Sequence, residues 1–297
     1  LAATAPDLAS KLPTVSPSNT CAGFVSPYFQ RKYGFPADAH VIIFTGDNPS
    51  SLIGMGAGEP GTVVISLGTS DTFFAAMPAV RTDPNGYGHV FGNPAGGFMS
   101  LVCIRNGSLA REKIRSQLGV DWSAFDTEGL SRTTPGNSGN GMIPFIGPEI
   151  APRVDFEEPL LFGSKEFREN PHPDQLVRAC LEGQFINMRL QTKWIDTQTN
   201  AIRLTGGAST NDGIAQTVAD VMGAPVDRLA ISGSVATGAV LRAAKALGGA
   251  YDQIEAILCA PTEGSRRIPT PGAREIYAPL EDTFNNALTD WQRQAAD

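Results

Sequence analysis

The stretch that decides the fold lies between residues 41 and 74 and contains two consecutive strand-and-turn units. It reads VIIFTGDNPSSLIGMG over residues 41–56, GEPG over residues 58–61 and TVVISLGTSDTFF over residues 62–74. Each unit is an apolar, β-branched run that stops at glycine, which is the pattern of a buried strand followed by a turn. Two strand-and-turn units are therefore expected to follow each other along the chain.

Both turns carry residues suited to phosphate chemistry. In the first unit Asp47 directly follows a glycine at the expected start of a helix, where its carboxylate could accept a proton. In the second unit the strand breaks at Gly68, Thr69 and Ser70 and resumes at once, which predicts a tight hairpin whose amides and hydroxyls could hold an anion. The sequence thus offers a base and a phosphate-binding turn close together in the chain.

Bulk composition favours a globular protein that acts on small molecules. The chain has 297 residues, 41% of them hydrophobic, and a formal net charge of -7. This negative charge argues against nucleic acid or an anionic membrane surface as a partner, because both would be repelled. No apolar run approaches the ~18 residues of a membrane span. The four cysteines are widely spaced, which predicts free thiols in a reducing, cytoplasmic location.

Regular segments surround the two units in an order typical of an α/β protein. After a Pro- and Ser-rich linker (13–19), a helix is expected over residues 21–33, ending at Gly34. Three or four strands and a helix come next, and residues 119–170 are read as a long excursion with short strands. The expected strands are 62–66, 72–77, two within 88–105, 201–204 and 226–231, and the expected helices are 106–118, 176–194, 211–222 and 234–247. This order predicts an RNase H-like domain, the fold of actin- and hexokinase-type ATPases.

A second glycine cluster, TGGASTND over residues 205–212, lies where a strand meets a helix. Gly206 and Gly207 would let a ligand approach the backbone, and Asn211 or Ser209 would cap the helix. Each signal has a plainer alternative when it is taken alone. Asp47 can be a helix cap, and the glycines can serve only their turns.

Other conspicuous residues are given structural roles. The three histidines show no ligand spacing, so no zinc site is predicted. The tryptophans are expected in packing and Glu182 in bracing a helix. The basic series Arg105, Arg111, Lys113 and Arg115 is expected mostly on a solvated helix face, with a contact between Arg105 and a phosphate as the alternative. The histidines are His40, His89 and His172, and the tryptophans are Trp122, Trp194 and Trp291.

Six motifs, in this order, resemble the C-terminal half of the FGGY family of carbohydrate kinases, and the resemblance to its xylulokinases is close. They read FTGDNPSSLIG, VISLGTSDT, GHVFGNP, IRNGSLAREKIR, LEGQF and LTGGASTN. The resemblance covers roughly residues 20 to 250. It implies two actin-like lobes with an active site between them, ATP and Mg²⁺ as cofactors, and transfer of the γ-phosphate to a ketopentose such as D-xylulose.

The resemblance also implies roles for individual residues. Asp47 would be the catalytic base, and Asn48 would contact the sugar. The Gly68-Thr69-Ser70 turn would hold the β- and γ-phosphates, and Gly107 would line the nucleotide cleft. Gly206, Gly207 and Asn211 would contact the adenosine.

The family's N-terminal lobe is missing from this sequence, which starts at Leu1 and reads like the middle of a longer protein. Residues 1–58 would be the remnant of that lobe and residues 59–297 the C-terminal nucleotide-binding lobe. Magnesium ligands cannot be assigned, because the family's metal binding depends on the missing lobe. Two alternatives stay open: a nucleotide-binding module without catalysis, and a kinase for another ketose or polyol. A homodimer also stays open.

Overall fold

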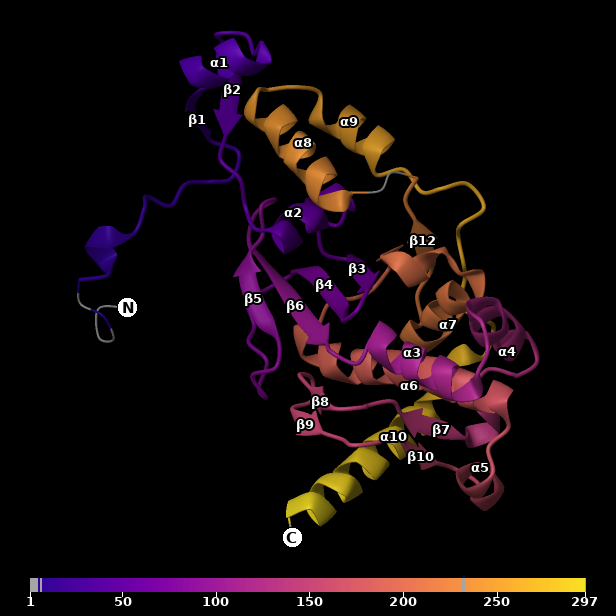
Figure 1. Ribbon diagram of the computed structural model, residues 1–297. Coiled ribbons are helices and arrows are strands. Elements are labelled where there is room, and N and C mark those ends of the chain that lie inside the picture. The colour runs from indigo at the N-terminus through magenta and orange to yellow at the C-terminus, as the bar shows by residue number, and fades with distance from the viewer. Residues whose placement is uncertain (1–4, 6, 231–232, 297) are drawn as a thin grey trace.

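The centre of the molecule is a six-stranded mixed sheet, seen in a computed structural model that describes residues 5, 7–230 and 233–296 (Figure 1). The strand order is β12-β11-β3-β4-β6-β5, in which β12, β11 and β3 run parallel and β3, β4, β6 and β5 run antiparallel. The bounds are Thr62–Leu67 (β3), Asp71–Met77 (β4), His89–Gly92 (β5), Phe98–Ile104 (β6), Ala201–Thr205 (β11) and Val226–Arg228 (β12). The predicted strands are confirmed, although Ile231, the expected end of the last one, lies outside the described residues.

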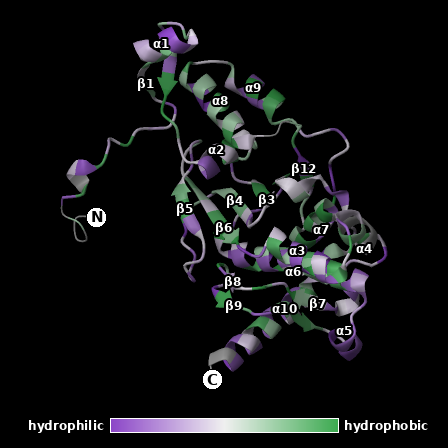
Figure 2. Cartoon of the chain, in the orientation of Figure 1, coloured by the Kyte–Doolittle hydropathy of each residue, from purple (hydrophilic) through white to green (hydrophobic). Residues whose placement is uncertain are grey.

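Helices cover both faces of this sheet, because its central strands bury side chains on both sides. One face packs its Val63, Ile65 and Phe73 into the main core, to which helices α3, α6, α7 and α10 contribute. The other face packs Val64 and Phe74 against α2. On its far side α2 packs against α8 and α9. The bounds are Asp47–Gly54 (α2), Ser108–Leu118 (α3), Pro173–Thr192 (α6), Asp212–Met222 (α7), Ser234–Ala246 (α8), Tyr251–Leu258 (α9) and Ala273–Ala296 (α10). Figure 2 shows hydrophobic residues gathered on the central strands, in agreement with this layering.

Two glycines let helices α2 and α8 cross in direct backbone contact. A Cβ atom added to Gly238 would overlap the carbonyl oxygen of Ser50, and one added to Gly54 would overlap that of Ser234. Hydroxyl groups strengthen the same crossing, since Ser50 Oγ donates to the Val235 carbonyl at 2.8 Å. Larger side chains would separate the helices, so this crossing fixes where α2 lies on the sheet.

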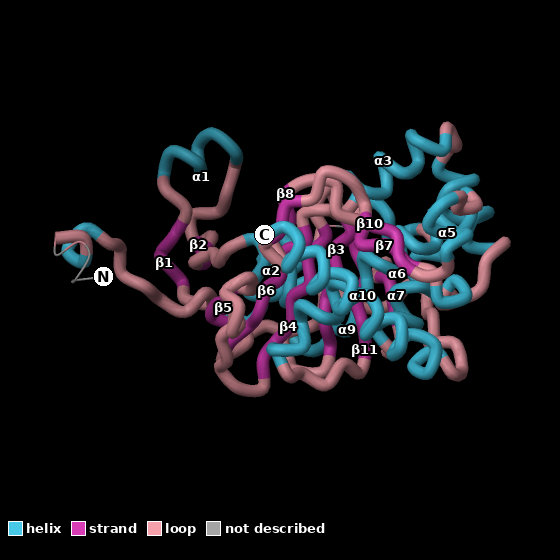
Figure 3. The backbone as a smooth tube through the Cα atoms, turned by 90° about the horizontal axis from the view of Figure 1, so that it is seen from below, coloured by secondary structure: helices cyan, strands magenta, loops and turns pink. Residues whose placement is uncertain are grey.

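The N-terminal segment stands apart from the body, as Figures 1 and 3 both show. It contains a short 3₁₀ turn (Ala9–Lys11), a two-stranded sheet of β1 (Cys21–Phe24) and β2 (His40–Ile42), and helix α1 (Pro27–Tyr33). The expected helix over residues 21–33 is therefore wrong in its first part and right in its end, where Gly34 adopts the left-handed conformation at φ 74°. Pro27 at the first helical turn sets the start, because proline has no N–H to continue the helix backwards.

The excursion between α3 and α6 contains short elements, as the sequence predicts. It packs under α6, with β7 pairing β10 and β8 pairing β9. Its elements are a π-helical turn (Ser123–Glu128), α4 (Gly129–Ser131), a 3₁₀ turn (Asn137–Gly139), β7 (Gly141–Ile143), β8 (Pro148–Glu149), β9 (Val154–Asp155), β10 (Leu160–Phe162) and α5 (Lys165–Glu169). Short 3₁₀ turns also follow α6 and β11, at Lys193–Ile195 and Gly207–Thr210.

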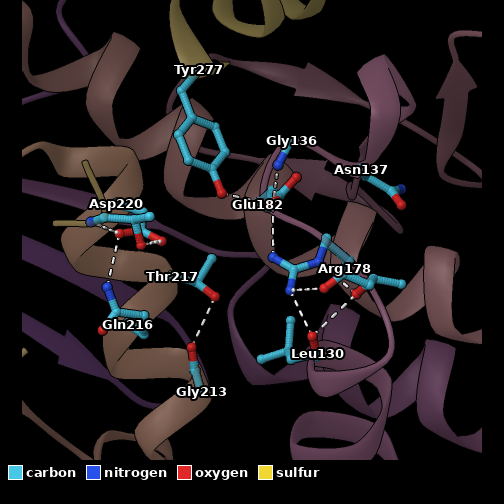
Figure 4. A network of polar contacts seen from close by, with 12 residues as sticks. Leu130, Gly136, Asn137, Arg178, Glu182, Gly213, Gln216, Thr217, Asp220 and Tyr277 are labelled. Carbon is cyan, nitrogen blue, oxygen red and sulfur yellow. Dashed lines mark hydrogen bonds and ion pairs between the residues drawn. The ribbon is translucent and has the colours of Figure 1, made fainter. Parts of the chain in front are cut away.

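A buried carboxylate ties α6 to this excursion and to α10 (Figure 4). Glu182 Oε1 accepts hydrogen bonds from Arg178 at 3.0 Å, the Tyr277 hydroxyl at 2.7 Å and the Gly136 backbone N–H at 2.9 Å. Burial raises the pKa of Glu182, and these donors oppose the rise. The bracing role predicted for Glu182 is thus confirmed, and the polar contacts join three segments that are distant in sequence.

Several smaller predictions also have outcomes. All four cysteines are free, as predicted, and Cys180 and Cys259 are buried. Trp194 and Trp291 pack against the core, but Trp122 is 44% exposed and so is not a core residue. His172 is structural, because its side chain caps the start of α6. Within the described part of the chain, no helix is both long and apolar enough to cross a membrane.

The α2/α8 crossing gives a first testable prediction. Gly238→Ala should lower the free energy of unfolding by about 1–3 kcal/mol, because the added methyl group forces the two helices apart. Denaturant unfolding followed by circular dichroism measures this change. Gly92→Ala is the control, since a Cβ there meets no atom within 4 Å, and its effect should stay within about 0.5 kcal/mol. Equal stability of the two variants would contradict the crossing.

Candidate functional site

The predicted hairpin joins β3 to β4 at one end of the central sheet. Leu67 pairs with Asp71, so Gly68, Thr69 and Ser70 form a three-residue loop between them. Thr69 is exposed, whereas Gly68 and Ser70 are half-buried. Gly68 does not adopt a positive φ. The plainer explanation, that the turn needs glycine here for its backbone conformation, therefore does not hold. A Cβ at this position would instead lie 3.3 Å from the Ser70 carbonyl oxygen.

A second predicted residue, Gly107, lies directly against the foot of this hairpin. It is the residue before α3, and the next backbone N–H, of Ser108, donates to the Gly68 carbonyl at 3.0 Å. A Cβ on Gly107 would come within 2.7 Å of the Asp71 nitrogen and 2.6 Å of its Oδ1. Only glycine permits this approach, so the β6–α3 connection and the hairpin are in contact.

The second glycine cluster approaches the same hairpin from the other side. Gly206 has a φ of +91°, and a Cβ there would lie 2.7 Å from the backbone nitrogen of Leu67, the last residue of β3. Gly207 faces open space. The Asn211 side chain accepts a hydrogen bond from the Ile214 N–H at 2.9 Å and so caps α7, as predicted. The structure therefore brings Gly68, Gly107 and Gly206 together at one sheet end.

A buried ion pair lies beneath these loops. Arg111 contacts Asp71 through two parallel hydrogen bonds of 2.9 and 3.0 Å, and both side chains are 1% exposed. The prediction that Arg111 lies on the solvated face of its helix is wrong. Its position between Ala110 and Ile114, both buried, is the sequence signal that could have placed it on the inner face. Burial raises the pKa of Asp71, and the guanidinium of Arg111 opposes that rise.

Gln184 of α6 extends this buried pair to the backbone of the second loop. Its Oε1 accepts a hydrogen bond from Arg111 at 2.9 Å, and its Nε2 donates to the carbonyls of Asn106 and Gly107, both at 2.7 Å. The sequence analysis did not identify Gln184. A glutamine buried in the middle of a helix is itself a signal, because such a group needs partners on neighbouring elements.

Asp47 and Asn48 occupy the start of α2, on the opposite face of the sheet from α3 and α6. Gly46 is the N-cap and Asp47 the first helical residue, so Asp47 is not the cap that the plainer interpretation proposed. Asp47 is exposed, and its Oδ1 accepts hydrogen bonds from the backbone N–H of Asn48 at 2.8 Å and from its amide at 3.3 Å. These contacts do not reach the three loops, so the roles of both residues stay predictions.

A cavity of about 690 Å³ opens beside the second glycine cluster. Gly206 lines it, while Gly68 and Gly107 do not. Its charged lining consists of Arg228, Arg267, Asp212 and Glu263, and both arginines pair with Asp212. Burial alone would raise the pKa of Asp212, but hydrogen bonds from the two arginines lower it. The cavity thus presents guanidinium groups next to the loop that the sequence assigns to a nucleotide.

Residues of this site do not fit a magnesium ion. Among the described residues, no three His, Cys, Asp or Glu side chains gather closely enough to hold a metal. Asp71, at the foot of the hairpin, forms a buried ion pair with Arg111. No magnesium ligand is therefore assigned to this chain.

Comparison with known proteins agrees with these features. Residues 63–247 match the model of the FGGY family of carbohydrate kinases, C-terminal domain. A xylulose kinase of Rattus norvegicus is 39% identical over 292 residues, which cover 94% of this chain and 53% of that protein. A xylulose kinase 2 of Arabidopsis thaliana is 35% identical over 260 residues, 82% of this chain and 46% of that protein. The chain thus spans about half the length of these relatives.

Solved structures show the same fold. The ligand-bound xylulose kinase from Lactobacillus acidophilus superposes with a TM-score of 0.83 at 19% identity, covering 94% of this chain and 57% of that chain. The family match includes the hairpin, Gly107 and the second glycine cluster. This chain belongs to the FGGY family of carbohydrate kinases, and its central sheet with the loops at its end is the family's C-terminal domain.

Proposed function

We propose that this chain supplies the nucleotide-binding half of a sugar kinase that transfers the γ-phosphoryl group of ATP to D-xylulose, giving D-xylulose 5-phosphate. The observation that carries the proposal is the contact of Gly68 and Gly206 with neighbouring backbone at one sheet end, next to Gly107. Glycine at these positions lets the three loops meet at one sheet end. Turns of this kind can present main-chain N–H groups to an anion. Two curated relatives named xylulose kinase support the choice of sugar.

Within this proposal the hairpin residues Gly68, Thr69 and Ser70 hold the β- and γ-phosphates. Gly107 lines the cleft, and Gly206, Gly207 and Asn211 contact the adenosine. Phosphoryl transfer requires little covalent chemistry from the protein, so positioning and electrostatic stabilisation supply most of the rate enhancement. ATP enters as the substrate that brings the phosphoryl group, and no residue of this chain is proposed as a ligand of Mg²⁺.

Asp47 is proposed as the general base that accepts the proton of the attacking hydroxyl, with Asn48 contacting the sugar. Its exposed carboxylate lies at the first turn of α2, a helix fixed on the sheet by its crossing with α8. A carboxylate that is held in place but open to solvent is free to meet an incoming alcohol. In the complete kinase, residues 1–58 would be the remnant of the first lobe and residues 59–297 the second lobe, with α2 packed on the central sheet of the second lobe through its crossing with α8.

A second candidate function is a nucleotide-binding module without catalysis. The observation that favours it is the place of Asp47, whose hydrogen bonds to Asn48 do not reach the three glycine loops. A kinase for another ketose or polyol is a further candidate, because family membership alone does not fix the sugar. Cytoplasmic location and a homodimer stay predictions.

Calorimetric titration of this chain with ATP, AMP and D-xylulose tests the nucleotide site. ATP should bind with a dissociation constant of roughly 10 μM to 1 mM, the usual range for such substrates. AMP should bind at least about 10-fold more weakly, because it lacks the phosphates that the hairpin would hold. Binding of D-xylulose in addition to ATP would contradict the module. Equal affinity for ATP and AMP would contradict the assignment of residues 68–70.

Asp47→Asn in the complete kinase tests the base. Removing the proton acceptor should lower kcat by about 10²- to 10⁴-fold, whereas the KM for ATP should stay within about 3-fold, because the nucleotide loops are unchanged. Steady-state assays with D-xylulose and ATP measure both constants. Asp38→Asn, which alters an exposed carboxylate of the same N-terminal segment, is the matched control. Turnover near the wild-type rate in the Asp47 variant would refute the role.

A further inference from the structure

We propose that Gln184 and Arg111 are positioning residues that hold the hairpin and the β6–α3 loop in one fixed arrangement for nucleotide binding. The proposal rests on the proposed function, because it assumes that these loops bind the phosphates. Neither residue would touch the nucleotide. Both would act through the backbone of the loops, from beneath them.

The first step is the way in which the hairpin is held. The carbonyl of Gly68 accepts the Ser108 N–H at 3.0 Å, which ties the hairpin to the start of α3. Asp71, at the end of the hairpin, keeps its orientation because Arg111 contacts both of its oxygens. The hairpin is thus held both by the first residue of α3 and by a guanidinium of the same helix.

The second step is that both terminal nitrogens of Arg111 are engaged within the protein. Besides Asp71, its Nη1 donates to Gln184 Oε1 at 2.9 Å and its Nη2 to Ser108 Oγ at 3.1 Å. The charge of Arg111 is balanced by Asp71, and its side chain is 1% exposed. Arg111 is accordingly no phosphate ligand. It acts as a fixed centre from which Asp71, Ser108 and Gln184 are oriented.

The third step concerns Gln184, which links both loops to helix α6. It is 2% exposed, and it uses its oxygen for Arg111 and its nitrogen for the carbonyls of Asn106 and Gly107. The amide of Gln184 therefore holds the Arg111 guanidinium that orients the hairpin. The same amide also holds the Asn106 and Gly107 carbonyls just before α3. A change at residue 184 would shift the two loops together, although α6 itself contributes nothing to the cavity beside Gly206.

Gln184→Met tests this coupling, because methionine keeps the length of the side chain and removes all of its hydrogen bonds. Gln191→Met is the matched control: it lies on the same helix, and its amide contacts Asn187 of that helix. Two quantities are measured, residue-resolved amide hydrogen exchange of the ligand-free chain and ATP affinity by calorimetry. In Gln184→Met the amides of Gly68 and Ser108 should exchange about 10-fold faster, and ATP should bind about 10-fold more weakly. Gln191→Met should change neither.

A purely structural role gives a different result. In that case Gln184→Met lowers the melting temperature and retains ATP affinity, and it accelerates exchange of the Gly68 and Ser108 amides no more than exchange of the α7 amides. This result would show that the coupling is wrong. If this variant does not fold, Gln184→Glu takes its place, since a carboxylate still accepts the bond from Arg111 and loses the two donated bonds. Should the amides respond in a chain that binds no ATP, the coupling stands and the proposed function fails.

Discussion

The arrangement of the candidate site depends on one buried ion pair, between Asp71 at the start of β4 and Arg111 of α3. Two fully buried charges are tolerated only because they satisfy each other, and removal of one partner typically costs about 3–5 kcal/mol. The pair lies between the hairpin and the start of α3, so it fixes two loops from different elements. Gln184 extends this constraint to α6, which Glu182 in turn braces against α10. The rigid part of the domain therefore supports the loops directly.

The opposite face of the sheet is organised by a different constraint, the glycine-mediated crossing of α2 and α8. There the backbones meet, and the contact leaves α2 little freedom to slide or rotate. Asp47 begins this helix, so its position relative to the sheet is set by Gly54 and Gly238. One sheet thus serves both proposed components, the base through α2 on one face and the phosphate loops through α3 and α6 on the other.

Much of this fold could be predicted from the sequence, because its central strands are β-branched runs ended by glycine and its helices have clear periodicity. Residues 21–24 were predicted in a helix, yet they form a strand because they pair with residues 40–42, a contact that no local pattern reveals. Gly68, Gly107 and Gly206 meet at one sheet end, and their roles in nucleotide binding stay predictions. Gly107 and Gly206 are needed for close backbone approach, which only tertiary structure shows. Arg111 was misplaced because a charged residue on a helix is usually solvated, and its partner Asp71 lies 40 positions away.

The central claim is that the loops at residues 68–70, 107–108 and 206–207 all contact one bound nucleotide. Its most direct test is a titration of the isotope-labelled chain with ATP, monitored by the NMR chemical shifts of backbone amides. The account predicts the largest shifts in these three loops, saturating together at one dissociation constant. Shifts centred on other surfaces, or loops that respond at different ATP concentrations, would contradict it.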